Sequence, residues 1–551
     1  MKKLSRCLMR VKFLAFSDTK PYSFNPITYW LRSFYEKNGT YSNEYEWLPT
    51  EYFYEDNIVD KILSESTDIL CLSVYLWNFE SMMRVAREVS LRDPSISIIV
   101  GGPECHAHTE DDWFDKYDFV DFAVYGDGEK AFADLLDWHV DPEKASLDSI
   151  PNIVYRDHVA KHAIFRFREW EEYSPYLDLS DEFLAEYKSF KSKVGDDAFV
   201  YLPYERARGC MYSCAFCDWQ GGLHYKVNSR INDYKPEIDF FVENKIRSMH
   251  IDANVGMLKE DLPLYEYVYS KMQENDLKFI PTEPRNMAKL HKDKVAKIYD
   301  ILCKASPNYN VKVSLQSIYD DVLSYIDRPD VPWDKHKRII MKTKSDHPGI
   351  KVVPELIMGL PGMTYDRVNE THLEFTDIPM THIFSYEWIL LKKAPAYSAS
   401  YREKNNLTYA KVFYPAIFTG TDTGDTDSIS YSDFLKDPSI PINKNQAYYI
   451  DMVYSTDMGI KGVIYHKMIT RLYNRMAYDP KFGREWLTEY LNDHSEFLID
   501  AAAKEAELQE ELFDTYGFYV WGKCDTINNR INNYEAVIDR YIDITLGEKD
   551  P

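Results

Sequence analysis

The sequence has few cysteines, no long apolar run and little positive charge for its acidic content. Eight cysteines in 551 residues are too few, and too widely spread, to form a disulfide framework. No run reaches the roughly 18 apolar residues that a membrane helix requires. The formal charge of −24 argues against the clustered Lys and Arg that binding a nucleic-acid backbone needs. These absences favour a protein of the reducing cytoplasm, with no membrane and no nucleic acid among its partners.

The amino-terminal stretch is basic and then apolar, but we expect no secretory leader there. Arg10 and Lys12 interrupt the apolar part, and no small-residue cleavage site follows. With 45% apolar and 15% aromatic residues, the chain is able to build a large core, and its length predicts two or three domains. Five scattered cysteines are expected to be mostly buried small hydrophobic residues: Cys7, Cys71, Cys105, Cys303 and Cys524.

The other three cysteines lie within eight residues, at Cys210, Cys214 and Cys217. Four-iron clusters normally take four cysteines, so three would leave one iron free to bind a substrate or cofactor. A structural zinc site is the alternative. Zinc would require a fourth Cys or His at finger-like spacing, and His224 is the only nearby candidate.

This C-x3-C-x2-C spacing, with Phe216 before the last cysteine, resembles the radical SAM superfamily. The resemblance implies a 4Fe–4S cluster whose open iron is chelated by S-adenosylmethionine (SAM). It also implies an external electron donor of the flavodoxin or ferredoxin type, and SAM cleavage to a 5′-deoxyadenosyl radical. The continuation Asp218-Trp219-Gln220 is similar to the Cys-Asp-Trp-Gly ending of a subset that includes natural-product methyltransferases, with Gln220 as a departure.

Residues 1–145 alternate apolar strands with helices. Strands are predicted at 11–16, 69–75, 97–100 and 122–125. This pattern predicts a doubly wound, Rossmann-like α/β domain, with a parallel sheet covered on both faces. Ligands of such sheets bind beyond the carboxyl ends of the strands, where glycines here allow close approach. The alternative is that these glycines only make tight turns. No G-x-G-x-x-G follows the first strand, so a nicotinamide site is unsupported.

The order of these strand ends, ahead of the cysteines, resembles the cobalamin-binding domain of B12-dependent radical SAM enzymes. The resemblance implies corrin contacts from Ser73, Tyr75, Trp77, Asn78, Gly101, Gly102, Glu104, Gly126, Gly128 and Glu129. The D-x-H-x-x-G element, which supplies a lower axial histidine in some cobalamin enzymes, is absent after the first strand. The cobalt would then carry water, another side chain or nothing on that face.

After a linker at 146–198, which contains a predicted hairpin of 150–156 with 160–167, residues 199–400 show six strand–helix repeats. They match the partial (β/α)6 TIM-type barrel of the superfamily, with strands near 199–204, 249–256, 278–281, 311–317, 351–362 and 384–391. The cysteines follow the first strand, at the end where barrel active sites lie.

Polar residues at the barrel strand ends carry the rest of the resemblance. The resemblance implies that Phe216 contacts SAM, and that Asp252 and Asn254 contact its amino group. It implies contacts from Ser314 and Gln316 to the SAM ribose and carboxylate. It also implies a contact from Arg328 to the carboxylate and one from Glu355 to the ribose. Each could singly be an ordinary polar residue at a strand end. Their joint order behind the cysteines favours SAM binding.

Residues 401–551 are predicted to form a mainly helical domain that caps the barrel. A strand pair is expected at 409–418, followed by helices at 444–458, 462–476, 482–490, 496–515 and 527–545. The segments 431–449 and 516–521 are candidates for facing the substrate.

The sequence thus indicates a radical SAM enzyme, with cobalamin-dependent methyl transfer to an unactivated carbon or phosphorus of a small-molecule or peptide substrate as the first hypothesis. The alternatives are a cobalamin-independent radical rearrangement or cyclisation, and a non-catalytic cluster- or cobalamin-binding sensor. Methylthiolation of tRNA is disfavoured because the sequence has neither a further cysteine set in its first domain nor a basic tail.

Overall fold

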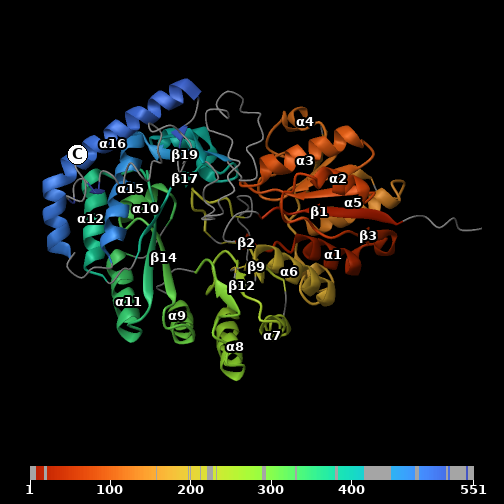
Figure 1. Cartoon of the computed structure of the whole chain (residues 1–551), viewed down its shortest axis with the longest axis horizontal. Coiled ribbons are helices and arrows are strands. Elements are labelled where there is room, and N and C mark those ends of the chain that lie inside the picture. The colour runs from red at the N-terminus through yellow and green to blue at the C-terminus, as the bar shows by residue number, and fades with distance from the viewer. Residues whose placement is uncertain are drawn as a thin grey trace, which may run out of the picture.

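Three regions follow one another along the long axis of the molecule, with the α/β domain at one end and the blue C-terminal helices at the other (Figure 1). The computed structural model describes residues 8–17, 22–144, 146–156, 158–195, 198, 200–210, 212–219, 228–230, 233–287, 293–328, 332–378, 382–414, 448–477, 483–516, 519–520, 542–543 and 546.

The first region is built on a seven-stranded sheet of order β3-β1-β4-β5-β6-β7-β8. Its strands are β1 (Met9–Leu14), β3 (Tyr45–Trp47), β4 (Ile69–Ser73), β5 (Ser97–Gly101), β6 (Phe122–Val124), β7 (Ile153–Tyr155) and β8 (His158–Val159). Pairing is parallel from β3 to β6 and antiparallel beyond. The predicted doubly wound fold is confirmed. The predicted linker hairpin, however, extends this sheet, and its second strand is β8 and not 160–167.

Helices cover both faces of this sheet: α1 (Ile27–Asn38), α2 (Ile58–Ser64), α3 (Phe79–Arg92), the short α4 (Trp113–Lys116) and α5 (Glu129–Val140). Successive side chains of a strand point to opposite faces. Accordingly, Cys71 of β4 joins the apolar cluster of Phe34 and Leu136, from α1 and α5. Leu72 joins the opposite cluster with Met82 of α3. This double burial explains why the strands are apolar throughout.

A short strand from the first region belongs to the barrel. β2 (Tyr22–Ser23) pairs in parallel with β9 (Val200–Tyr204), and the backbone N–H of Phe24 donates to the carbonyl of Tyr201 over 2.9 Å. Phe24 then packs edge-on against Phe183 of the connecting helix α6 (Ser180–Val194). The boundary between the two regions is therefore interleaved.

The barrel has six strands, the predicted number, in two ladders. β9 pairs with β12 (Ser248–His250), which pairs with β13 (Thr282–Pro284), while β14 (Asn310–Gln316), β15 (Lys351–Ile357) and β16 (Phe384–Tyr386) form the second ladder. The helices between and after them are α7 (Lys235–Glu243), α8 (Asp261–Glu274), α9 (Asp293–Ala305), α10 (Asp320–Tyr325), α11 (Trp333–Asp346) and α12 (Tyr365–Thr376). The third strand begins just after the predicted 278–281, and the second is shorter than predicted.

The C-terminal region combines a sheet with two long helices. The sheet order is β17-β19-β18-β20, formed by β17 (Trp388–Ile389), β18 (Leu407–Tyr414), β19 (Tyr448–Ser455) and β20 (Tyr519–Val520), with the short helix α13 (Ala399–Lys404) before β18. The helix predicted at 444–458 is wrong where it is described, because 448–455 is β19. Aromatic and β-branched residues there suit a strand. The predicted segments 431–447 and 527–541 lie outside the described residues.

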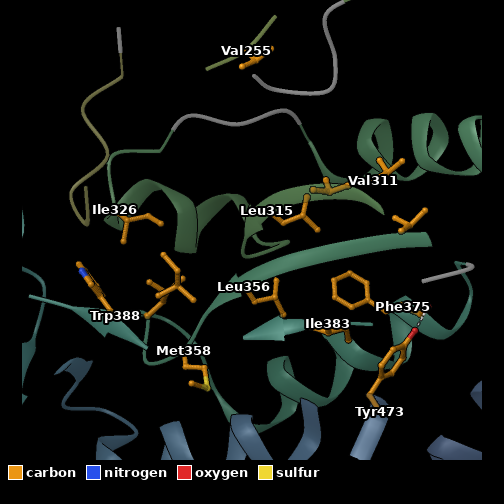
Figure 2. Packing of buried hydrophobic residues seen from close by; sticks show 14 of the residues in the cluster. Val255, Val311, Leu315, Ile326, Leu356, Met358, Phe375, Ile383, Trp388 and Tyr473 are labelled. Carbon is orange, nitrogen blue, oxygen red and sulfur yellow. Dashed lines mark hydrogen bonds between the residues drawn. The ribbon is translucent and has the colours of Figure 1, made fainter. Parts of the chain in front are cut away.

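The two helices are α15 (Gly459–Met476) and α16 (Arg484–Tyr516), which unites the helices predicted at 482–490 and 496–515. Figure 2 shows Tyr473 of α15 beside Phe375 of α12, in a core that continues to Leu315 and Leu356 of the barrel strands. The Tyr473 hydroxyl donates to the Phe375 carbonyl over 3.0 Å. These helices pack on the outside of the barrel, and a capping role stays a prediction. In the described part of the chain, no helix is long and apolar enough to cross a membrane.

Candidate functional site

The three cysteines lie on a loop that leaves the carboxyl end of β9. The loop begins with β10 (Ala207–Arg208), which pairs with β11 (Asn228–Ser229), and Gly209 then takes a φ of 111°, which suits glycine. The backbone N–H of Ala215 donates to the carbonyl of Ile326, and the N–H of Ala396 donates to the carbonyl of Ala215. Backbone from two other parts of the barrel therefore fixes the middle of the loop.

Each sulfur lies within reach of a donor. The Asn254 side chain donates to Cys210 Sγ over 3.1 Å, and the backbone N–H of Trp219 donates to Cys217 Sγ over 3.4 Å. The guanidinium of Arg328 lies 3.8 Å from Cys214 Sγ. The same guanidinium lies 6.0 Å from the ring centre of Phe216. Asn254, Arg328 and Phe216, all predicted site residues, therefore meet at the cysteines. Donors of this kind stabilise thiolates.

The three cysteines fit a metal-bound state better than three free thiols. Burial raises the pKa of the Cys217 thiol to about 11, although the Trp219 N–H opposes this, so a bound metal is needed to hold it as thiolate at neutral pH. Within the described residues, no three His, Cys, Asp or Glu side chains are arranged to hold one metal ion. A cubane spreads its thiolates over separate irons. His224 lies outside the described residues.

Asp252, which follows β12, anchors the start of the cysteine loop. One carboxylate oxygen accepts from the backbone N–H groups of Arg206 and Ala207, at 2.8 and 3.0 Å. The other oxygen lies 2.9 Å from His250 Nε2. Burial opposes ionisation of Asp252, but the neighbouring His250 and Arg206 outweigh it and hold its pKa below the usual value. A SAM contact from Asp252 stays a prediction.

The predicted residues of β14 and β15 face one another. The Ser314 hydroxyl donates to a carboxylate oxygen of Glu355, and Arg328 donates to the Ser314 carbonyl over 2.6 Å. The β14–β15 register shifts between Ser314 and Gln316, and Gln316 has a φ of 63°. Its side-chain oxygen is buried without a hydrogen-bond partner, which fits an acceptor reserved for a ligand.

The carboxyl edge of the first sheet has close backbone approaches. At Gly102, with a φ of +123°, an added Cβ would lie 2.4 Å from the carbonyl oxygen of Val74, so the turns after β4 and β5 touch here. At Gly101 the nearest atoms to such a Cβ are 3.7 Å away. Gly126, which follows β6, also has a positive φ, of +71°. Gly102 is thus required by the close packing of two turns, which fits the tight-turn alternative, and a corrin cradle at this edge stays a prediction.

Side chains after β4 have mixed roles. Asn78 is buried, accepts from the Tyr75 N–H over 2.7 Å and donates to the carbonyls of Phe16 and Ser73, so it ties two strand ends together. The Asn25 side chain donates to the Ser73 hydroxyl over 3.3 Å. The rings of Tyr75 and Trp77 stack at 4.7 Å, and 42% of Trp77 is exposed, which leaves it accessible to a ligand.

Glu129 meets the cysteine loop. Its carboxylate receives two hydrogen bonds from Arg208, at 2.7 and 3.0 Å, and one from the Tyr173 hydroxyl over 2.8 Å. Gly128 lies just before it, at the start of α5. Arg208 also donates a hydrogen bond to Glu205. Burial raises the pKa of Glu205 to about 7, although the positive charge of Arg208 opposes this rise.

Another predicted residue, Glu104, pairs with a histidine that the prediction missed. His106 Nε2 lies 3.2 Å from its carboxylate, and His106 Nδ1 is buried without a hydrogen-bond partner. Burial opposes ionisation of Glu104, but His106 outweighs it and holds the Glu104 pKa below the usual value. The sequence signal for His106 was only its place after the Gly-Gly-Pro turn.

The chain is similar in sequence to known proteins. Residues 45–136 match the family model of the B12 binding domain. The chain is 31% identical, over 311 residues, to 2-(S-pantetheinyl)-carbapenam-3-carboxylate methyltransferase of Streptantibioticus cattleyicolor. It is 30% identical, over 308 residues, to the cobalamin-dependent radical SAM methyltransferase TokK of Streptomyces tokunonensis. Each match covers 53% of this chain and 42% of the relative, so the chain spans less than half the length of these relatives.

Two solved structures share the fold at low identity. The radical SAM methyltransferase TsrM of Kitasatospora setae, solved with tryptophan and a SAM analogue, has a TM-score of 0.60 at 13% identity, over 87% of this chain and 90% of that one. The cobalamin-dependent SAM radical enzyme OxsB, solved with aqua-cobalamin and SAM, has a TM-score of 0.60 at 12% identity. That match covers 98% of this chain and 80% of the OxsB chain. The chain therefore carries a B12-binding domain and shares the fold of cobalamin-dependent radical SAM enzymes.

Proposed function

We propose that the protein is a cobalamin-dependent radical SAM methyltransferase that acts on a small-molecule or peptide substrate. The observation that carries this proposal is the pair of hydrogen bonds from Arg208, beside the cysteine loop, to Glu129 of the first domain, which supports two cofactor sites that lie close together. When bound, a 4Fe–4S cluster with SAM supplies a radical and cobalamin supplies a methyl group. Bringing both to one substrate requires such a junction.

The residues divide between three tasks. We propose that Cys210, Cys214 and Cys217 hold the cluster, with Asn254 and Arg328 donating toward their sulfurs. SAM would lie along the ends of β14 and β15, where Gln316 offers a buried acceptor and Glu355 a carboxylate. The corrin would lie on the glycine-lined edge after β4, β5 and β6, beside Tyr75 and Trp77.

The surroundings of the site suit radical chemistry, which needs water and oxygen kept away. Cys214 is 8% exposed and Ala215 is fully buried. The barrel and the first domain would enclose the substrate between them. We further propose that the enzyme works in the reducing cytoplasm, with an external electron donor of the flavodoxin or ferredoxin type, because such a cluster is oxygen-sensitive.

Anaerobic reconstitution tests this function. The wild-type protein, with iron, sulfide, hydroxocobalamin, SAM and dithionite, is expected to release 5′-deoxyadenosine and to show a cobalamin absorption band. Cys214→Ala should abolish the release, whereas Cys303→Ala, at a buried cysteine of α9, should retain it. A full cluster without SAM cleavage, with the substrate present, would support a sensor. SAM cleavage with no cobalamin band would support cobalamin-independent rearrangement or cyclisation.

The substrate class named for the carbapenam relative is the first to assay. That relative's name specifies a pantetheinyl carbapenam carboxylate. Transfer of a labelled methyl group from SAM to such a compound, read by mass spectrometry, would extend the relative's activity to this chain. No transfer, with SAM cleavage intact, would assign the chain another small-molecule or peptide substrate.

A further inference from the structure

One guanidinium joins the turn proposed to carry the corrin to the loop proposed to carry the cluster. Arg208 Nη2 lies 2.7 Å and Nη1 3.0 Å from the two carboxylate oxygens of Glu129, a two-point contact. Nη1 also lies 3.1 Å from Asp127, and Nε lies 2.8 Å from Glu205. Three carboxylates from two regions of the chain therefore fix the plane of this side chain.

Aromatic rings and burial hold the same group in place. The guanidinium carbon lies 5.5 Å from the ring centre of Trp30 and 5.0 Å from that of Phe167. The side chains of Arg208 and Glu129 are 13% and 3% exposed. A buried, ring-stacked, two-point pair is far more rigid than a surface ion pair, because its planar fork fits the carboxylate in one geometry.

Each partner in this contact is close in sequence to a residue that we propose binds a cofactor. Cys210 is two residues beyond Arg208, so their Cα atoms are at most about 7.6 Å apart. On the other side, Asp127 and Glu129 flank Gly128 in the turn that follows β6, at the edge proposed for the corrin. A displacement of Arg208 relative to Glu129 would therefore change the distance between the two cofactor sites.

We propose that Arg208 is a positioning residue that sets the separation and orientation of the cobalamin and cluster sites. This inference rests on the proposed function, because it needs both cofactors bound. It assigns Arg208 no contact with substrate or cofactor. Its partner Glu129, predicted from sequence to touch the corrin, acts in the same contact from the other side.

Pulsed dipolar EPR on the loaded, reduced protein tests this inference. Cobalamin is held as cob(II)alamin and the cluster as its one-electron-reduced form, so that both are paramagnetic. The wild type should give one narrow distribution of the distance between them. Arg208→Lys retains the charge but loses the fork, and Glu129→Gln retains the shape but loses the charge. Both should broaden the distribution and shift its maximum.

The matched control is Arg367→Gln. Arg367 bonds Asp321 over 2.8 Å and stacks on Tyr319, but it joins α12 to α10 on the barrel alone. Its distribution should equal that of the wild type. Unchanged distributions in Arg208→Lys and Glu129→Gln, with cobalamin and iron contents at the wild-type level, would overturn the inference and leave the proposed function intact. Absence of bound cobalamin in the wild type would overturn the proposed function itself.

Discussion

The side-chain amide of Asn254 donates a hydrogen bond to the sulfur of Cys210 over 3.1 Å. Asn254 follows β12 and Cys210 follows β9, so the contact crosses between two neighbouring barrel strands. Hydrogen bonds to cluster sulfurs are among the features that set an iron–sulfur reduction potential. The contact therefore offers a direct way to test the cluster assignment.

Asn254→Ala and Asn254→Asp should both lower the reduction potential of the cluster, because neither side chain donates to Cys210 at neutral pH. A hydrogen bond to a charged group contributes about 1.5–3 kcal/mol. The reduced cluster would then be harder to form, so a smaller fraction of each variant should be reduced, and release 5′-deoxyadenosine, at a fixed dithionite concentration. Redox titration followed by EPR, with 5′-deoxyadenosine release, measures both effects. Asn244→Ala, at the end of α7, is the control, and an unchanged potential in both Asn254 variants would contradict the role.

Gly102→Ala should destabilise the first domain and weaken cobalamin binding, whereas Gly101→Ala should be much milder. At Gly102 the φ of +123° and the 2.4 Å approach of the Val74 oxygen both exclude a Cβ, while the Cβ at Gly101 meets only ordinary contacts. Strained backbone of this kind costs about 1–3 kcal/mol. Urea denaturation gives the stability, and absorbance after gel filtration gives the cobalamin content. Equal stability of the two neighbouring variants would contradict the steric role of Gly102, and an unchanged cobalamin content in Gly102→Ala would contradict a corrin site beside this turn.

Gln316→Leu should have effects of opposite sign on stability and on SAM binding. Removing a buried acceptor that has no partner should raise the free energy of unfolding of the SAM-free protein by about 1–3 kcal/mol. The same change removes the proposed ligand contact, so SAM should bind more weakly by calorimetry. Gln273→Leu, on the exposed side of α8, is the comparison. A Gln316→Leu protein that binds SAM as tightly as the wild type would remove Gln316 from the site.

His372 predicts a loss of stability in mild acid. Burial lowers its pKa to about 4, although the hydrogen bond to the Val368 carbonyl opposes this, and its Nε2 lies 3.0 Å from the Thr470 hydroxyl between α12 and α15. The unfolded chain, with a His pKa near about 6.5, then binds more protons than the folded protein. The contribution of His372 is fully present above pH 6.5 and is lost as the pH falls toward 4.

One pKa unit corresponds to about 1.4 kcal/mol, so the full contribution of His372 is on the order of 3 kcal/mol. His372→Gln should flatten the fall in unfolding free energy between pH 6.5 and pH 4.5 relative to the wild type. Chemical denaturation of both proteins across this range measures the difference. Parallel curves for the two proteins would show that His372 does not carry this proton linkage.

Local pattern predicted the regular parts of the fold well. The apolar run at 69–75 contains β4, and the run at 97–100 lies within β5, because a strand buried on both faces must be apolar throughout. The tail was harder. A helical period was predicted at 444–458, yet Tyr448 to Ser455 pairs with β18 along its whole length. Pairing with a distant strand decided its conformation, and no local pattern records that partner.

The sequence indicated candidate ligands, but not the contacts that support them. The cysteines were evident from spacing, whereas Arg208 and Glu129 are 79 residues apart and only the packing of two regions brings them together. Asp252 was placed correctly at a strand end, but nothing in the sequence indicated that its carboxylate would hold the backbone of Arg206 and Ala207. Sequence motifs identify candidate groups, and tertiary contacts decide which group each one serves.

The pairing of β2 with β9 has a consequence for how this protein can be divided. A cut between residues 145 and 179 would leave the first strand of the barrel without Tyr22 and Ser23, and Phe24 without its aromatic neighbours on α6. Two fragments separated there should fold and associate only when mixed. Exchange of cofactor domains between relatives would succeed only if residues 22–24 were matched to the recipient barrel. The residues that must be exchanged together therefore do not form one contiguous segment of the chain.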